Sequence, residues 1–285
     1  MENSSNKLIP ASTVLVIRDG ADDIEVFMVV RHHQIDFASG ALVFPGGKVD
    51  ESDFNPELRR YVFAEKEISD QELSYKIAGI RECYEEADVL FAYEQNKKEI
   101  ISSEKLEKLA QWRDKFNNKK GSMFDFAVKE NIKFNLDNLI PFAHWITPKM
   151  MPKRFDTYFY LAEAPKDHIG KHDGKESIDS IWISPKQALE DCKAEKRTII
   201  FPTRMNLEKL SKFRTVKEAL DEVKKETVIT VEPEIEKNED GVFLTIPEKA
   251  GYGLIKEPIE NLSLIHISEP TRRYASSYAV FCLKK

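Results

Sequence analysis

Short apolar runs that end at turn residues dominate the first part of the chain. Residues 11–17 and 24–30 are rich in aliphatic and β-branched side chains, and Asp19-Gly20 lies between them. Two such runs around a turn predict a β-hairpin. A third run, residues 41–44, stops at Pro45-Gly46-Gly47, which predicts a strand that enters a tight loop.

A long helical pattern follows this loop. Ser69 and Glu72 have the spacing of a capping box, which marks the start of a helix. Apolar residues then recur at intervals of three and four on one helix face, at Leu73, Ile77, Ile80 and Tyr84. The pattern therefore predicts an amphipathic helix that packs against a core.

A polar segment, about residues 94–138, separates this helix from the rest of the chain. It is rich in Lys and Glu, but Leu106, Leu109 and Trp112 within it have helical spacing. We predict that the segment forms a helical insertion or a lid.

After the insertion, strand and helix patterns alternate irregularly. Runs of β-branched and aromatic residues predict strands at residues 139–146, 157–162, 178–183, 227–231 and 242–246. Helices are predicted at residues 186–192, 202–212 and 216–225, with Pro185 in the first turn of the first one. The acidic residues 232–240 are predicted to form a loop. This irregular alternation favours an α/β fold with a mixed sheet and helices on both faces.

Composition narrows the class of protein. The chain has 285 residues, of which 41% are hydrophobic and 32% are charged, and no apolar run is long enough to span a bilayer. A net charge of −6 and a pI near 5.7 argue against a general nucleic-acid binder. Three Cys without paired spacing exclude a disulfide scaffold and a Cys-rich zinc module. The first residues lack the pattern of a signal peptide, so we expect a cytoplasmic protein.

The last residues, 262–285, do not resemble a folded segment. They read LSLIHISEPTRRYASSYAVFCLKK, which resembles the translation of a sequencing-library adapter. The alternative is a terminal strand over AVFCL. We expect an adapter-derived tail after a single domain at residues 1–261. The tail carries a net charge of +3, so residues 1–261 carry −9.

Three carboxylates in the predicted helix carry the most chemical information. Glu82, Glu85 and Glu86 are spaced at i, i+3 and i+4, which places them on one face within one turn. Like charges at this spacing repel, and a bound cation would remove the repulsion. Hard oxygen ligands suit Mg²⁺ or Mn²⁺. The alternative is a solvated acidic helix face.

Two neighbours of the triplet strengthen the metal hypothesis. Arg81 lies four residues before Glu85 and could orient its carboxylate. Gly46 and Gly47 allow the backbone to approach a ligand closely, and their carbonyls could complete the oxygen shell of a metal. A Gly-Gly pair alone is also compatible with a simple turn.

Together these residues resemble the Nudix box, G-x5-E-x7-R-E-U-x-E-E-x-G-U, of the Nudix hydrolases. Gly47 opens the box, Arg81-Glu82-Cys83-Tyr84-Glu85-Glu86 matches its centre, and Val89 ends it. Arg81 follows Gly47 by 34 positions, an insertion of 20 relative to the family pattern. Asp53 replaces the first Glu, and Asp88 replaces the late Gly. Because Asp tolerates the left-handed conformation, we expect Asp88 at the end of the helix.

The split box resembles one subgroup, the coenzyme A diphosphatases of the mammalian peroxisomal type and their bacterial relatives. Their two box segments correspond to residues 46–50 and 80–90. Their upstream pattern is matched by Arg31, Gly40 and Phe44-Pro45-Gly46-Gly47. Asp36 stands where several members have a second Arg, which leaves coenzyme A specificity open.

The resemblance implies an α/β/α sandwich with a mixed sheet and helical insertions. It also implies metal-dependent hydrolysis of a pyrophosphate bond. Glu85 and Glu86 would bind Mg²⁺ or Mn²⁺, Glu82 would bind a second ion or act as the base, and Arg81 would orient these carboxylates. A Gly46 or Gly47 carbonyl would complete the metal shell.

The implied substrate is a small-molecule nucleotide, coenzyme A or acyl-coenzyme A in the first instance. One alternative is a Nudix hydrolase for ADP-ribose, dinucleotides or nucleotide sugars. Another is a noncatalytic nucleotide-binding domain with a regulatory role. Neither nucleic acid nor a membrane is expected as a partner, and a homodimer is one possible assembly.

Substrate contacts are expected from Arg31, Gly47, Arg154 and Glu176. Glu176 precedes a predicted strand and could act as an extra acidic base or ligand, or be a solvated loop charge. Arg154 could meet a phosphate or form a salt bridge with Asp156 or another carboxylate. Arg204, at a predicted helix start, is a weaker candidate of the same kind. No partner at zinc spacing supports His144 as a metal ligand.

Overall fold

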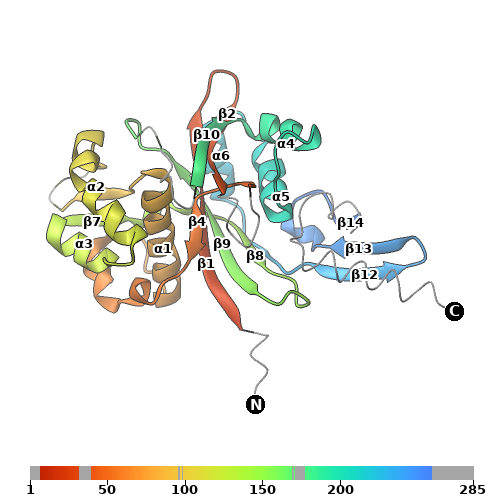
Figure 1. Cartoon of the computed structure of the whole chain (residues 1–285), viewed down its shortest axis with the longest axis horizontal. Coiled ribbons are helices and arrows are strands. Elements are labelled where there is room, and N and C mark those ends of the chain that lie inside the picture. The colour runs from red at the N-terminus through yellow and green to blue at the C-terminus, as the bar shows by residue number, and fades with distance from the viewer. Residues whose placement is uncertain are drawn as a thin grey trace, which may run out of the picture.

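A mixed β-sheet forms the centre of the molecule (Figure 1). The computed structural model describes residues 7–31, 40–95, 97, 99–168, 170 and 177–258. Asp36, Glu176 and the tail at residues 262–285 lie outside these residues. Within the described chain the central sheet has eight strands: β1 (Leu8–Asp19), β2 (Ile24–Arg31), β3 (Leu42–Val43), β4 (Gly46–Lys48), β8 (Ile140–Ile146), β9 (Arg154–Glu163), β10 (Ser177–Ile183) and β11 (Thr230–Val231).

The sheet contains both strand directions. Its order is β10-β2-β1-β9-β8-β11, with β3 paired to β2 and β4 paired to β1. β1 and β2 form the predicted hairpin, and β1 pairs with β9 in parallel from Leu8↔Arg154 to Ile17↔Glu163. β8 and β11 are also parallel, whereas the other pairs are antiparallel. The predicted mixed sheet is therefore confirmed.

Helices cover both faces of this sheet, as the predicted α/β/α sandwich requires (Figure 1). α1 (Asp70–Ala87) lies on one face, and α4 (Pro185–Lys193), α5 (Phe201–Leu210) and α6 (Val216–Val223) lie on the other. Helices α2 (Ser103–Asn117) and α3 (Met123–Glu130) lie beyond α1 and do not cover the sheet directly. Successive side chains of β1 enter different cores, because a strand alternates its faces. Val14 and Val16 pack in the core of α1, whereas Leu15 and Ile17 pack in the core of α5 and α6. No described helix is long and apolar enough to cross a bilayer.

Helix α1 lies close to β1 because Gly79 has no side chain. A Cβ at Gly79 would lie 2.8 Å from Ser12 Oγ and 3.2 Å from Val14 Cγ2. The helix begins at Ser69, whose side chain accepts a hydrogen bond from the Glu72 amide, as the capping-box spacing predicts. This close contact sets the distance between α1 and β1, the strand with which β4 pairs.

The two insertions meet in a second, smaller layer behind α1. The box insertion contains two 3₁₀ helices, η2 (Glu51–Phe54) and η3 (Pro56–Tyr61), and strand β5 (Val62–Phe63). The later insertion adds α2, α3 and strand β7 (Ile132–Asn135), followed by the 3₁₀ helix η4 (Leu136–Asn138). β7 lies between β5 and β6 (Ala92–Glu94), and it is parallel to β5.

Aromatic side chains fix the later insertion onto α1. The Tyr84 hydroxyl donates a hydrogen bond of 2.7 Å to the Leu109 carbonyl. The Tyr84 and Phe126 rings are stacked with their centroids 5.6 Å apart, and Trp112 is buried in the same core. These contacts hold α2 and α3 of the later insertion against α1.

The C-terminal part of the described chain differs from the prediction. Strand β12 (Glu234–Asn238) occupies most of the predicted acidic loop, so that prediction was wrong. It pairs with β13 (Gly241–Thr245), which pairs with β14 (Lys256–Pro258) after the 3₁₀ helix η5 (Glu248–Ala250). The charged residues of β12 lie on a surface hairpin, where both faces of a strand can remain solvated. The predicted strand at residues 227–231 is shortened to β11.

The end of α1 confirms the expectation for Asp88. Asp88 is the C-cap, with φ 54° and ψ 36°, and its amide donates to the Cys83 and Tyr84 carbonyls.

We expect Asp88→Gly to raise the free energy of unfolding by about 0.5–1 kcal/mol, because Gly adopts positive φ without steric cost. Urea unfolding will measure the change. As a control, Ala87→Gly, one residue earlier in the helix, should destabilise, and a destabilising Asp88→Gly would contradict the cap.

Candidate active site

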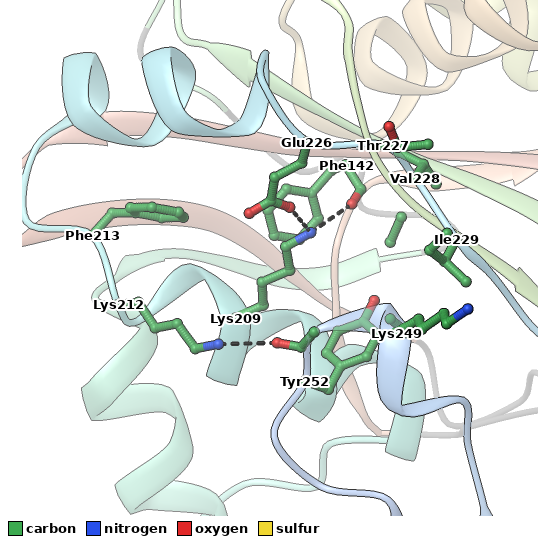
Figure 2. A pocket seen from close by; sticks show the side chains of 13 residues that line it. Phe142, Lys209, Lys212, Phe213, Glu226, Thr227, Val228, Ile229, Lys249 and Tyr252 are labelled. Atoms are coloured by element: carbon green, nitrogen blue, oxygen red, sulfur yellow. Dashed lines mark hydrogen bonds and ion pairs between the residues drawn. The ribbon is translucent and has the colours of Figure 1, made fainter.

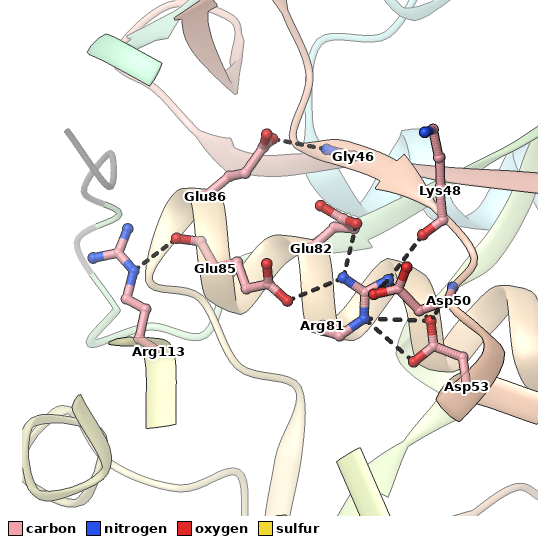
Figure 3. A network of polar contacts seen from close by, with 9 residues as sticks. All are labelled: Gly46, Lys48, Asp50, Asp53, Arg81, Glu82, Glu85, Glu86 and Arg113. Carbon is pink, nitrogen blue, oxygen red and sulfur yellow. Dashed lines mark hydrogen bonds and ion pairs between the residues drawn. The ribbon is translucent and has the colours of Figure 1, made fainter. Parts of the chain in front are cut away.

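The last turns of α1 carry a buried group of charged side chains (Figure 3). Glu82 and Glu86 are buried and Glu85 is half-buried, although all three are carboxylates. The predicted spacing places them on one side of the helix, where they face β4 and the box insertion. Burial of three like charges requires compensation from neighbouring groups.

Arg81 supplies most of this compensation. Its guanidinium is 2.9 Å from a carboxylate oxygen of Glu82 and 3.0 Å from one of Glu85. On the other side it contacts Asp53 at 2.9 Å, and it donates to the Lys48 carbonyl at 2.8 Å. Arg81 thus joins the box helix to β4 and η2. That Arg81 orients these carboxylates for catalysis stays a prediction.

Asp53 also contacts Arg81, although the sequence did not predict it as a site residue. Its side chain is fully buried, and it also accepts a hydrogen bond from the Asp50 amide at 2.9 Å. Its position at the first acidic place of the box was the available clue. Asp is one methylene shorter than the family's Glu, yet it reaches Arg81 from the 3₁₀ helix of the insertion.

The Gly46-Gly47 strand contacts the other side of the carboxylates. The Gly46 amide donates a hydrogen bond of 3.0 Å to Glu86 Oε2. A Cβ at Gly47 would lie 2.5 Å from Glu82 Oε1, so this backbone lies directly on the Glu82 carboxylate. The Pro45 carbonyl accepts from Val14, and the Lys48 carbonyl faces Arg81. Because carbonyls alternate along a strand, the Gly46 carbonyl points to the α1 side with that of Lys48.

Burial shifts the protonation equilibria of this group. Desolvation raises the pKa of Glu82 well above its usual value, Arg81 opposes this, and the charges of Glu85 and Glu86 raise it further. Desolvation also raises the pKa of Glu85 and of Asp53, in both cases against the effect of Arg81. Burial alone would lower the pKa of Arg81, but Glu82 and Asp53 hold it above its usual value. The positive charge of Arg81 is therefore permanent.

The charge balance fits a divalent cation. Asp53, Glu82 and Glu85 share the Arg81 guanidinium, so three ionised carboxylates at this residue keep excess negative charge. Glu86 accepts from the Gly46 amide beside them. Its donors are the hard oxygens that Mg²⁺ and Mn²⁺ prefer. In the described part of the chain, no three His, Cys, Asp or Glu side chains are already gathered as a metal cage. Glu82 and Glu85 are held by Arg81 instead, so a cation would have to share them with it.

A residue of the later insertion also reaches this end of α1. Arg113 in α2 donates from Nε to the Glu85 carbonyl at 2.8 Å, and its guanidinium lies 3.9 Å from the Asp88 carboxylate. The last carbonyls of a helix lack hydrogen-bond donors within the helix. Arg113 supplies a donor to one of these carbonyls, and its positive charge lies beside the acidic residues Glu85 and Asp88. The sequence contained no clue to this contact, because α2 meets α1 only through tertiary packing.

The predicted substrate-binding residues do not all meet at this group. Arg154 is buried at the start of β9, where it contacts Glu232 at 2.6 Å and the Thr147 carbonyl at 3.0 Å. Arg154 pairs with Leu8 and Gly46 pairs with Thr13, so they differ by about 16 Å along β1. The salt-bridge alternative therefore describes Arg154 in this structure, with Glu232 as the partner instead of Asp156.

Arg31 is the last residue of β2. Near this end β1 and β2 separate, and the short strands between them are β3, which pairs with β2, and β4, which pairs with β1. Its Nε atom is buried and has no hydrogen-bond partner within the part of the chain that the structure describes. Arg204 pairs with Glu208 and Glu257. His144 bonds Asp156 and Thr230, away from the carboxylates of α1.

Comparison with known proteins identifies the family to which this fold and carboxylate group belong. The family model described as NUDT19 Nudix domain matches residues 65–210, which include α1 with its carboxylates. Acyl-coenzyme A diphosphatase NUDT19 of Xenopus laevis is 25% identical over 273 residues, with 81% of this chain and 72% of the relative covered. The chicken (Gallus gallus) protein of the same name is 23% identical, with 69% of this chain and 64% of the relative covered.

A solved structure agrees with the fold. A NUDIX hydrolase from Alicyclobacillus acidocaldarius is 25% identical and has a TM-score of 0.62, with 76% of this chain and 97% of that chain covered. The sandwich and the carboxylates of α1 define an enzyme of the Nudix hydrolase class. Within that class, the chain belongs to the NUDT19 Nudix domain family.

Proposed function

We propose that this protein hydrolyses the pyrophosphate bond of coenzyme A or of acyl-coenzyme A. The products would be 3′,5′-ADP and phosphopantetheine or its acyl form. Two relatives named acyl-coenzyme A diphosphatase support this substrate, as does the Arg31, Gly40 and Phe44–Gly47 pattern of the sequence. The observation that carries the reaction type is the buried carboxylate group on α1 beside the Gly46-Gly47 backbone.

Glu82, Glu85, Glu86 and the Gly46 carbonyl would hold Mg²⁺ or Mn²⁺. Such an ion would polarise the phosphoryl oxygens and lower the pKa of the attacking water. Arg81 holds Glu82 and Glu85 at fixed positions from the Asp53 side. Glu82, whose carboxylate lies on the Gly47 backbone, would bind a second ion or accept the proton of the attacking water.

Arg31 would bind a phosphate group of the substrate. Its Nε is buried without a partner among the described residues, and a phosphate oxygen would supply the missing acceptor. Gly47 would line the substrate side of the same strand. Glu176, outside the described residues, stays a prediction from sequence. For Arg154, the contact with Glu232 supports a structural role instead.

Gly47→Ala should lower kcat by at least about tenfold, which corresponds to about 1.4 kcal/mol of transition-state stabilisation. The new methyl group would lie 2.5 Å from Glu82 Oε1, so the buried carboxylate that Arg81 holds would have to shift. Steady-state kinetics with coenzyme A and Mg²⁺ will measure the loss, and the melting temperature should fall less than in a variant whose new methyl group meets the backbone.

Gly46→Ala is the matched comparison. Its Cβ would lie 2.6 Å from the Ser12 carbonyl oxygen and 2.5 Å from Thr13 Oγ1, so the strand pair β1–β4 must separate. We expect a loss of about 1–3 kcal/mol in stability. Equal stability losses with normal turnover in both variants would contradict the placement of Glu82 on Gly47.

The substrate is tested by comparing kcat/KM for coenzyme A, 3′-dephospho-coenzyme A and ADP-ribose. We expect coenzyme A to be preferred, and Arg31→Met to reduce kcat/KM for it. A tenfold preference for ADP-ribose, about 1.4 kcal/mol, would overturn the coenzyme A assignment and favour the alternative pyrophosphatase. Absence of Mg²⁺- or Mn²⁺-dependent phosphate products from any nucleotide would favour the noncatalytic alternative.

A further inference from the structure

A cavity of about 200 Å³ lies in the core on the other side of the sheet from the carboxylates. Figure 2 shows the residues that line it. It is bounded by β8, by the end of α5, by the segment that follows α6, and by the loop around η5. Phe142, Phe213 and Tyr252 form its apolar walls, and all three belong to the core of α5 and α6. We call it the lysine cavity because Lys209, Lys212 and Lys249 line it.

The most deeply placed ammonium group belongs to Lys209, which is only 8% exposed. Its Nζ donates to the Phe142 carbonyl at 3.1 Å and lies 4.6 Å from the centre of the Phe142 ring. It also forms an ion pair of 2.6 Å with Glu226, whose side chain is 46% exposed. The carboxylate that balances Lys209 therefore comes from the solvent side of the cavity.

The other two lysines lack such a carboxylate in the cavity. Both are exposed, and Lys212 donates from Nζ to the Gly251 carbonyl at 3.1 Å. Among the described residues that line the cavity, Glu226 alone carries a negative charge, against three ammonium groups. The lining thus has an excess of two positive charges next to aromatic walls.

We propose that the lysine cavity binds a small phosphate monoester that carries an apolar group. A phosphate monoester has a charge of about −1.5 to −2 at pH 7, which matches the excess. Its oxygens would accept from the ammonium groups, and its apolar part would lie against Phe213 and Tyr252. The volume is below the roughly 300–1,000 Å³ of sites for drug-sized ligands, so a small molecule fits best.

This site is independent of the proposed catalytic group. The carboxylates lie with α1 on one face of the sheet, whereas Lys209, Phe142 and Tyr252 lie in the core of the other face. Binding can therefore be measured without turnover, and its failure would leave the proposed hydrolase activity unaffected.

The probe for this site is phenyl phosphate, titrated calorimetrically into the full chain at constant ionic strength. We expect saturable binding at one site, and we expect Lys212→Met with Lys249→Met to weaken it by at least about tenfold. Glu226→Gln should instead strengthen binding by about threefold or more, because it removes the competing carboxylate and frees Lys209. These opposite responses distinguish an anion site from a structural pair.

Two control variants and two control ligands complete the experiment. Glu222→Gln removes an exposed carboxylate of α6 that pairs with Lys225, and it should leave binding unchanged. Glu86→Gln should also leave it unchanged, since Glu86 belongs to the other face. Inorganic phosphate and benzoate should each bind more weakly than phenyl phosphate. Absence of saturable binding, or binding that survives loss of both lysines and does not respond to Glu226→Gln, would overturn the proposal.

Discussion

Glu86→Gln should leave the protein folded and lower kcat for coenzyme A by at least about a hundredfold, or about 2.7 kcal/mol of transition-state stabilisation. The amide keeps the shape of the side chain, and its oxygen can still accept the hydrogen bond of the Gly46 amide. It removes the negative charge that would hold a divalent ion next to the Gly46 carbonyl. The effect should therefore fall on the reaction rather than on the fold.

The measurement combines kinetics with metal-dependent melting. Mg²⁺ should raise the melting temperature of the wild type, because a ligand that binds only the folded state stabilises it, and it should raise that of the variant less. Glu72→Gln is the matched control, since Glu72 is on the same helix and pairs with Lys76 at 3.3 Å. Wild-type turnover in Glu86→Gln would remove Glu86 from the catalytic group.

Arg81→Met should be the most destabilising single change in the site. It would leave Asp53, Glu82 and Glu85 without their guanidinium, and removal of one partner from a buried ion pair costs about 3–5 kcal/mol. The variant would also lose the link from α1 to the Lys48 carbonyl of β4. Urea unfolding in the presence of a chelator will measure the loss without stabilisation by a bound cation.

An exposed arginine that pairs with the first turn of α1 provides the comparison. Arg59 in η3 contacts Asp70 at 2.7 Å, but its side chain is 41% exposed, so Arg59→Met should cost at most about 1 kcal/mol. The double variant Arg81→Met with Asp53→Asn should lose less than the sum of the single changes, because the second substitution removes a buried charge that Arg81 balances. A cost below about 1 kcal/mol for Arg81→Met would show that solvent, rather than Arg81, stabilises these carboxylates.

Local patterns were enough to predict several parts of the site. The spacing of Glu82, Glu85 and Glu86 requires that they share one face of a helix, whatever the helix packs against. The left-handed conformation of Asp88 was predicted from the Gly that the Nudix box has at this place, because Asp also tolerates that conformation. The hairpin is also a local feature, because turn residues determine it. Gly46 and Gly47 were predicted as part of a tight loop, but they form strand β4 by pairing with β1.

Such local patterns could not predict contacts between distant parts of the chain. Arg154 could have met a phosphate or a carboxylate, and only the fold brings Glu232, 78 residues away, to within 2.6 Å of it. Strand β12 was predicted as a loop because its charges suggest solvation, and its pairing with β13 overrides that preference. Arg113 reaches Glu85 only because the insertion packs on Tyr84.

The sequence by itself therefore determined the pattern of strands and helices and the shared helix face of Glu82, Glu85 and Glu86, since each depends on residues close together in the chain. The Gly46-Gly47 backbone meets these carboxylates across about 40 residues of chain, so the tertiary structure decided that contact. The tertiary structure decided which charges are buried together and how they are balanced. Asp53, in the box insertion, balances the charge of Arg81. On the opposite face, Lys209, Lys212 and Lys249 line the same cavity. Charge interactions depend on distance and burial, and only the packed sheet and its helices fix both.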